Sequence, residues 1–132
     1  MAVARARVPA RVPACEVTTC ETGSSQAPAR ATARFFQVLG DPTRFAIVEI
    51  LSAGERTVSQ LMAMTGASQS RVSNHLACLR WCRFVEGERR GRQVFYRLSD
   101  PRIEELLALG RELAAPSAEH LASCARIGPD WV

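Results

Sequence analysis

The sequence predicts a mainly α-helical domain that carries one small β-hairpin, an α+β fold class. Apolar residues recur at helical spacing in several separate segments between residues 29 and 115. Capping residues, glycine or proline stand at the ends of these segments, as is typical of helix boundaries. One further stretch, residues 84–98, places an alternating apolar and polar run after a glycine-containing turn, which is typical of two paired strands.

Composition places the chain among globular proteins of one domain. Its 132 residues are 47% hydrophobic and 23% charged. No apolar run approaches the roughly 18 to 20 residues that a membrane span needs, and the arginine-bearing first dozen residues lack the apolar region of a secretory signal. We therefore expect a cytoplasmic protein.

The basic residues are all arginine. The net charge is +4, and the seventeen basic positions contain no lysine. Arginine pairs bidentately with phosphate or guanine, which favours a nucleic-acid partner. A genome rich in G and C would also replace lysine by arginine, so the placement of the arginines is more informative than their number.

The first 27 residues are predicted to form a flexible arm, because they contain proline, glycine and serine with little periodicity. The arm includes Cys15 and Cys20, which are either incidental thiols or additional ligands for a soft metal ion. Residues 28–115 are expected to form the folded domain, and residues 116–132 a C-terminal tail.

Two helices are predicted at the start of the domain. The first spans about residues 29–39 and ends at Gly40. Asp41 caps the second helix and Pro42 suits its first turn, while a broad apolar face runs to Leu51. Residues 52–54 end this helix.

The next two helices form a predicted helix-turn-helix. Thr57 caps a short helix that closes at Gly66, and Ser68 caps a longer one that reaches Cys82. The second would be the recognition helix in a DNA groove, although an ordinary helical hairpin has the same spacing. Its early polar and cationic side chains can reach phosphates and base edges. The candidates are Ser68, Gln69, Ser70, Arg71, Ser73, Asn74 and His75. For His75, packing between helices is the alternative to DNA contact.

Residues 84–98 are predicted to form a β-hairpin with a basic tip, residues 89–92. A basic tip alone is often only a solvated turn. Following a helix-turn-helix, it indicates a winged helix whose wing lies along the phosphate backbone. The wing candidates are Arg89, Arg90, Arg92 and Gln93.

Five cysteines are an odd number, which argues against a disulfide framework. Cys78 and Cys82 are four residues apart on one helix face, where β-carbons are roughly 5 to 6 Å apart. A disulfide prefers about 3.5 to 4.5 Å. The pair can instead bend towards one ion, and sulfur ligands select soft metals. The alternative is that both residues are small buried hydrophobes.

Asp100 and Pro101 begin a last long helix, whose apolar face favours a homodimer because a two-fold protein matches a two-fold operator. A core helix in a monomer is the alternative. Pro116 ends this helix, and the tail that follows contains His120 and Cys124 and has room for one more short helix. Catalysis is not expected, because no cysteine has an evident base and orienting group, and the two histidines, His75 and His120, lie in the helix motif and the tail.

Residues 30–125 resemble the ArsR/SmtB family of small, dimeric, metal-responsive winged-helix repressors. The resemblance rests on three motifs, residues 39–44, 73–76 and 91–94. Within the family, the segment from Cys78 to Cys82 most resembles the actinobacterial cadmium- and lead-sensing branch. There, two recognition-helix cysteines and one C-terminal cysteine bind the metal, and the matching third position is Cys124.

Two departures exclude other sites of the family. Zinc and cobalt sensors carry Asp and His ligands at the start of the fifth helix, but Arg102 stands where the histidine is wanted. Another arsenic and cadmium pattern needs a cysteine pair early in the recognition helix, and residues 68–71 contain none.

The resemblance implies a repressor that binds double-stranded operator DNA as a homodimer and is released by a soft metal ion. Cadmium or lead is favoured, and mercury or trivalent arsenic is the alternative. A redox-sensing winged-helix regulator without metal is a further alternative.

Overall fold

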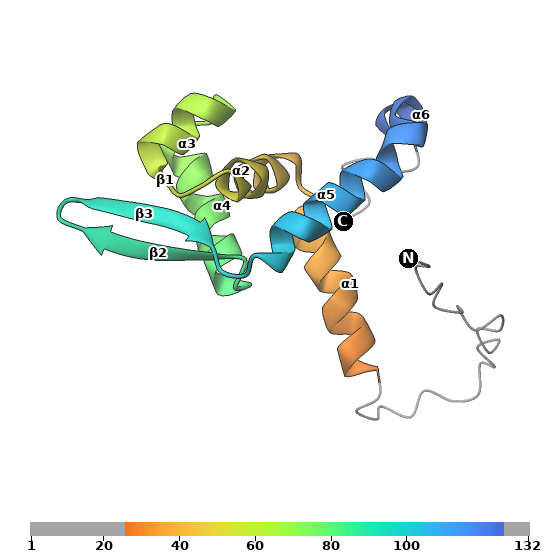
Figure 1. Ribbon diagram of the computed structural model, residues 1–132, viewed down its shortest axis with the longest axis horizontal. Helices are drawn as coiled ribbons and strands as arrows, with labels where there is room; N and C mark the ends of the chain where they lie inside the picture. The colour runs from red at the N-terminus through yellow and green to blue at the C-terminus, as the bar shows by residue number, and fades with distance from the viewer. Residues whose placement is uncertain (1–25, 126–132) are drawn as a thin grey trace, which may run out of the picture.

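The computed structural model describes residues 26–125 and confirms the predicted fold class (Figure 1). It is mostly helical with a small antiparallel sheet. The elements are α1 (Ala27–Leu39), α2 (Pro42–Ser52), β1 (Arg56–Thr57), α3 (Val58–Thr65), α4 (Gln69–Trp81), β2 (Val85–Arg90), β3 (Gln93–Leu98), α5 (Arg102–Ala114), the 3-10 helix η1 (Ala115–Ser117) and α6 (Ala118–Ser123).

The predicted helix caps are confirmed. The Asp41 carboxylate accepts from the Arg44 backbone N–H over 2.9 Å at the start of α2. Thr57 and Gln60 form a reciprocal capping box on α3, and the Ser68 hydroxyl caps α4. These bonds satisfy backbone N–H groups that have no partner within a helix. Two boundaries differ from the prediction: α1 starts at Ala27 rather than residue 29, and α4 ends at Trp81, with Cys82 as its C-cap.

The sheet has three strands, one more than the sequence predicts. β1 pairs antiparallel with β3 through Arg56↔Tyr96 and Thr57↔Phe95, so the strand order is β1-β3-β2. The β2–β3 register runs from Val85↔Leu98 to Arg90↔Gln93 and leaves a two-residue turn. The predicted tip of residues 89–92 is therefore corrected to Gly91 and Arg92, with Arg89 and Arg90 inside β2.

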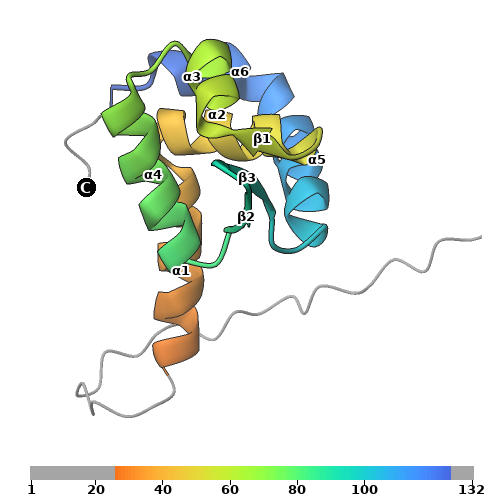
Figure 2. The same cartoon turned by 90° about the vertical axis from the view of Figure 1, so that its left-hand side faces the viewer.

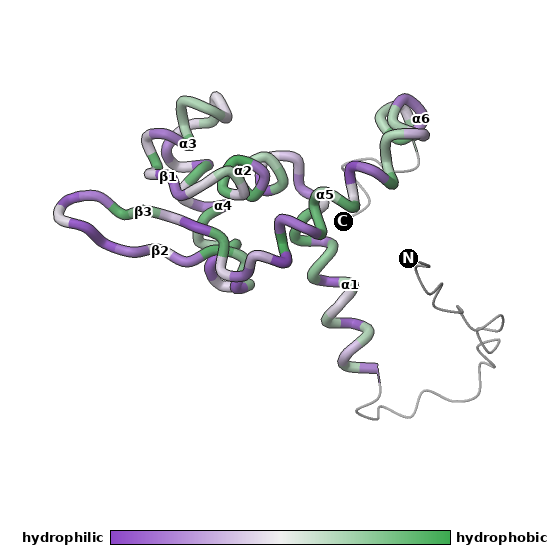
Figure 3. The backbone as a smooth tube through the Cα atoms, in the orientation of Figure 1, coloured by the Kyte–Doolittle hydropathy of each residue, from purple (hydrophilic) through white to green (hydrophobic). Residues whose placement is uncertain are grey.

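The hydrophobic core lies where α2, α3, α4 and α5 meet the base of the hairpin. Its largest fully buried side chain is Phe84, whose ring stacks on Phe35 of α1 with centroids 4.6 Å apart. In Figure 3, α2 is largely hydrophobic whereas β2 is hydrophilic along most of its length. The core residues are Ile47, Val48, Leu51, Leu61, Val72, Leu76, Leu79, Phe84, Val85, Ile103 and Leu107.

The arrangement separates two sides of the molecule. The β2–β3 hairpin extends from one side, beside α3 and α4, while α1 and α5 lie on the other (Figure 1). The quarter turn in Figure 2 places α4 alongside the other helices of the body, with its C-terminal end near α1. We refer to the β2–β3 hairpin as the wing.

α4 ends in a left-handed residue. Arg83 has φ 62°, the one non-glycine residue with positive φ among residues 26–125. The Phe84 backbone N–H donates to the Leu79 carbonyl oxygen, and the Ser99 hydroxyl donates to the Arg83 carbonyl oxygen. This termination directs the chain from α4 into the wing, at a position where glycine is normally preferred.

Replacing Arg83 by glycine is expected to raise the free energy of unfolding by about 0.5 to 1 kcal/mol. The left-handed conformation costs a non-glycine residue roughly 1 to 2 kcal/mol, and the added entropy of an unfolded glycine offsets part of the gain. Urea unfolding at fixed protein concentration measures the change. Arg80→Gly, inside the last turn of α4, is the control and should lower stability by about 1 kcal/mol. A loss of stability in both variants would contradict the strain at Arg83.

Candidate nucleic-acid interface and thiol site

One face of α4 is buried in the core, and the opposite face is exposed to solvent. Val72, Leu76 and Leu79 are fully or almost fully buried, which fixes the rotation of the helix against the core. The opposite face begins at the helix N-terminus, close to the turn from α3. All but one of the predicted recognition residues are exposed: Ser68, Gln69, Ser70, Arg71, Ser73 and Asn74.

His75 is the recognition candidate that the structure turns inward. Its side chain is 17% exposed, and its Nδ1 lies 4.0 Å from Oδ1 of Asp41. Partial burial raises the pKa of Asp41, but the Arg44 backbone N–H and the charges of Arg44 and His75 outweigh it, so the pKa is lowered overall. His75 thus packs against the N-terminus of α2 rather than extending from the recognition face.

Thr43 joins the recognition face, although the sequence did not single it out. Its hydroxyl accepts from Nη2 of Arg71 over 3.4 Å. Together with residues of the α3–α4 turn, Thr43 and Arg71 line a small open pocket between the start of α2 and that turn. In the sequence, Thr43 is only a polar residue in the first turn of a helix. Such residues are too common to indicate a functional role.

The predicted wing cations do not share one environment. Among the residues that the structure describes, Arg89 bonds only the Gly91 carbonyl oxygen, over 3.3 Å, and Arg92 lies exposed in the turn beside Gln93. Arg90, in contrast, is paired with Glu55 and Glu88. The structure therefore places three arginines at or near the wing tip, but within the described part of the chain only Arg90 of the three already has carboxylate partners.

Cys78 and Cys82 lie one turn apart at the end of α4. The Cys82 backbone N–H donates to the Cys78 carbonyl oxygen over 2.9 Å, which keeps both residues on one helix face. Cys78 is half-buried and Cys82 is exposed. Partial burial raises the pKa of the Cys82 thiol, and the neighbouring Cys78 thiol raises it further, while Arg44 acts in the opposite direction. The two thiols are close enough to interact, and both are soft donors, so the pair fits a soft metal ion.

The third predicted ligand does not join this pair within one chain. Cys124 is half-buried at the end of α6, which lies away from the C-terminal end of α4 in both Figure 1 and Figure 2. Among residues 26–125, no three His, Cys, Asp or Glu side chains are grouped so that they could hold a metal ion. Cys15 and Cys20 lie outside the described residues.

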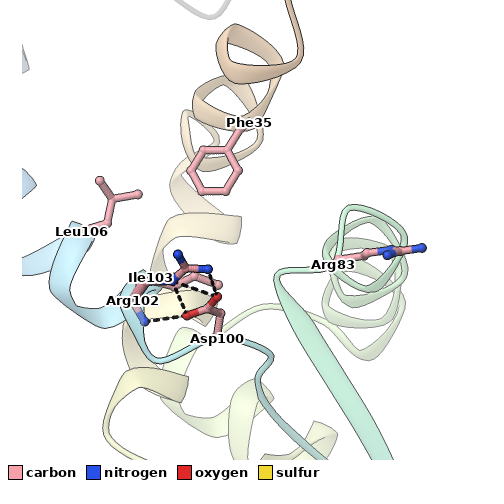
Figure 4. Close-up of a pocket in the computed structure, with 6 residues that line it drawn as sticks. All are labelled: Phe35, Arg83, Asp100, Arg102, Ile103 and Leu106. Carbon is pink, nitrogen blue, oxygen red and sulfur yellow. Dashed lines mark hydrogen bonds and ion pairs between the residues drawn. The ribbon is translucent and has the colours of Figure 1, made fainter. Parts of the chain in front are cut away.

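The start of α5 is occupied by an ion pair. Arg102 binds Asp100 with Nη2 2.6 Å from Oδ2, and this hydrogen bonding lowers the pKa of Asp100 to about 2. Figure 4 shows the pair at the rim of an open pocket whose apolar wall comes from Phe35 and Leu106. Asp100 therefore has a local cation as its partner, in keeping with the absence of a histidine beside it.

Large apolar side chains remain exposed on α1 and α5. Phe36 is 53% exposed, and Leu109 and Leu113 are 52% and 72% exposed. The two helices lie on the side away from the wing (Figure 1). A second protein chain packed on this side would remove these side chains from water.

Comparison with known proteins agrees with this geometry. The sequence model described as "Bacterial regulatory protein, arsR family" matches residues 41–86. A relative from Streptomyces lividans named "Probable mercury resistance operon repressor" is 45% identical over 96 residues, which cover 73% of this chain and 77% of the relative.

Two solved structures have the same fold. The cadmium metal-sensor CmtR from Mycobacterium tuberculosis is 43% identical, with a TM-score of 0.51 over 58% of this chain and 79% of that one. The homodimeric winged helix-turn-helix DNA-binding domain Mb0332 from Mycobacterium bovis is 28% identical, with a TM-score of 0.65 over 76% of this chain and 94% of that one. Within the part that the structure describes, no helix is both long and apolar enough to cross a membrane.

Proposed function

Because this chain belongs to the ArsR family of bacterial regulatory proteins, we propose that it is a metal-responsive transcriptional repressor. It binds double-stranded operator DNA as a homodimer, and it leaves the DNA when a soft metal ion binds cysteine thiolates. The observation that carries this proposal is the position of Cys78 and Cys82 on the same helix whose other end presents the recognition residues.

DNA binding is supported by the exposed polar face of α4 and the cationic tip of the wing. A recognition helix enters the major groove with its N-terminal residues nearest the base edges. Ser70, Arg71 and Asn74 are exposed at that end. The wing cations then reach the phosphates beside the groove, which fixes register without reading sequence.

Dimerisation is supported by the exposed apolar residues of α1 and α5. A monomer would leave Phe36, Leu109 and Leu113 in water, whereas a second copy of the chain would cover them. The similar winged-helix domain Mb0332 is itself homodimeric. Two recognition helices related by a two-fold axis match two half-sites about 10 base pairs apart.

The metal site consists of Cys78 and Cys82, completed by Cys124. Since Cys124 does not approach the pair within one chain, we assign it to the partner subunit, so that each site joins the recognition helix of one subunit to the tail of the other. Thiolate ligands stabilise soft ions and disfavour magnesium, calcium and manganese. Cys15 and Cys20 remain candidate additional ligands.

Cadmium or lead is the preferred inducer, because the cysteine pair resembles that of the cadmium- and lead-sensing branch and CmtR is named a cadmium sensor. Mercury is the second candidate, favoured by the name of the Streptomyces lividans relative. Cadmium, lead and mercury all accept thiolate ligands, so we expect them to bind the same cysteine site with different affinities.

Release follows from linkage between two sites. If metal-bound Cys78 and Cys82 favour a dimer conformation that no longer fits two successive grooves, DNA affinity falls. By reciprocity, DNA must weaken metal binding by the same factor. The feature that differs between the two dimer conformations is the orientation of α4 relative to the C-terminal tail of the partner subunit.

A cadmium titration of the reduced protein tests this function directly. Sulfur-to-metal absorbance and the anisotropy of a labelled duplex from the gene's upstream region are followed in the same sample. We expect both signals to change at the same equivalence point, because one event causes both, whereas magnesium should change neither. Protein that binds the duplex but neither absorbs with cadmium nor releases the DNA would remove the metal site and leave a winged-helix regulator.

A further inference from the structure

The guanidinium of Arg90 is held on its edge and on its face. Nη1 lies 2.6 Å from Oε1 of Glu55 and Nη2 lies 3.1 Å from Oε2, while Nη2 also lies 2.9 Å from Oε2 of Glu88. The Cζ atom stands 4.8 Å from the centroid of the Phe95 ring. A bidentate carboxylate together with an aromatic ring uses the geometry that distinguishes arginine from lysine.

These contacts join parts of the chain that are far apart in sequence. Glu55 precedes β1 and follows α2, 35 residues before Arg90 at the end of β2. The Arg90 side chain therefore spans the sheet, from the outer strand of the wing over Phe95 of β3 to the segment beside β1. It ties the wing to the body that carries the helix-turn-helix.

A second arginine extends this network along the same sheet face. Arg97 Nη1 lies 3.3 Å from Oε2 of Glu88, and its Nη2 lies 3.3 Å from Oε2 of Glu86. Hydrogen bonds from arginine lower the pKa of Glu55 and of Glu88, so both carboxylates stay charged at neutral pH. Single exposed ion pairs contribute little, but a bidentate network holds a defined geometry.

Arg89 and Arg92 contrast with Arg90. Arg89 alternates to the opposite face of β2, since successive strand residues point to opposite sides, and Arg92 lies in the turn. Within residues 26–125, neither has a carboxylate within ion-pair distance. Their charges are thus available to a phosphate, whereas that of Arg90 is already compensated.

On the basis of the proposed DNA-binding function, we propose that Arg90 is a positioning residue that fixes the wing against the body through Glu55, while Arg89 and Arg92 supply the wing's phosphate contacts. This assignment divides the predicted wing cations into one structural residue and two contact residues. It deepens the proposed function, because it names which charges of the wing meet DNA.

The salt dependence of DNA binding tests this division. The logarithm of the affinity falls with the logarithm of salt concentration by about 0.9 for each phosphate contact. The probe is a labelled random-sequence duplex of about 30 base pairs, long enough for two half-sites, so no operator needs to be known. The Glu55→Gln/Arg90→Gln double variant is compared with a matched double variant, Arg92→Gln/Glu119→Gln, and both conserve net charge.

We expect Glu55→Gln/Arg90→Gln to keep the wild-type salt slope and Arg92→Gln/Glu119→Gln to reduce it by about 0.9 per wing. An equal reduction in the two variants, together with a wild-type slope in Arg90→Lys, would make the charge at position 90 a phosphate contact and overturn the proposal. Wild-type protein that shows no salt-dependent binding would instead overturn the DNA-binding function, which distinguishes the two failures.

Lysine substitutions give a second, independent readout. A lysine at position 90 cannot form the two-pronged pair with Glu55, so Arg90→Lys is expected to weaken binding about fivefold, the value of one lost ion-pair network. Arg92→Lys should retain affinity, because lysine serves as a point charge for phosphate. Full affinity in Arg90→Lys would contradict a positioning role.

Discussion

Replacing Cys78 by serine is expected to leave DNA binding unchanged and to abolish release by cadmium. The hydroxyl is similar in size to the thiol but is a poor ligand for a soft ion. A coupling of about 3 kcal/mol corresponds to a loss of DNA affinity on the order of 150-fold when metal binds, and the variant should show almost none of it. Cys82→Ser should behave in the same way, since the two thiols lie on one helix face.

Operator anisotropy measured with and without cadmium gives the coupling for each variant. Ala77→Ser is the matched control, because Ala77 is exposed on the same helix and contributes no ligand. Cys124→Ser tests the third ligand, and mixed dimers that carry Cys78→Ser in one subunit and Cys124→Ser in the other test whether it acts across subunits. If the Cys78→Ser dimer still leaves DNA at the cadmium concentration that releases the wild type, Cys78 is not a metal ligand for release.

Replacing Phe84 by alanine is expected to cost about 3 to 5 kcal/mol of stability. The side chain is 1% exposed and its ring stacks on Phe35, so the substitution removes core contacts and leaves a cavity between α1 and the base of the wing. Native domains have only about 5 to 15 kcal/mol in total, so this substitution should remove a large share of the stability.

Urea unfolding at one fixed protein concentration measures this loss, because dimerisation makes apparent stability depend on concentration. Met64→Ala is the control: its side chain is 55% exposed and its removal should change stability little. Similar losses in the two variants would show that Phe84 is not central to the core. A loss confined to Phe84→Ala is the expected result, because Phe84, unlike Met64, is buried in the core.

The elements that could be predicted from the sequence are those decided by neighbouring residues. Asp41, Thr57 and Ser68 each cap a helix through a backbone N–H three residues later. Gly66 ends α3 in the left-handed conformation that favours glycine. The spacing of Cys78 and Cys82 likewise follows from helical geometry alone, and the structure keeps both residues on one face of α4.

What could not be predicted depends on partners far along the chain. β1 has two residues and no periodicity, and it exists because β3 pairs with it some forty residues later. His75 belongs to a polar run, yet its side chain faces Asp41 of another helix. Sequence spacing contains no information about either contact.

The wing shows this division most clearly. Its basic residues, its alternating strand and its glycine turn are local properties, so the sequence alone predicted a hairpin with a cationic tip. Which arginine remains available was decided only by the tertiary structure, because Glu55 reaches Arg90 from beyond the hairpin and not Arg89. Local patterns determine where charge lies along a chain, whereas folding determines which charges are already compensated.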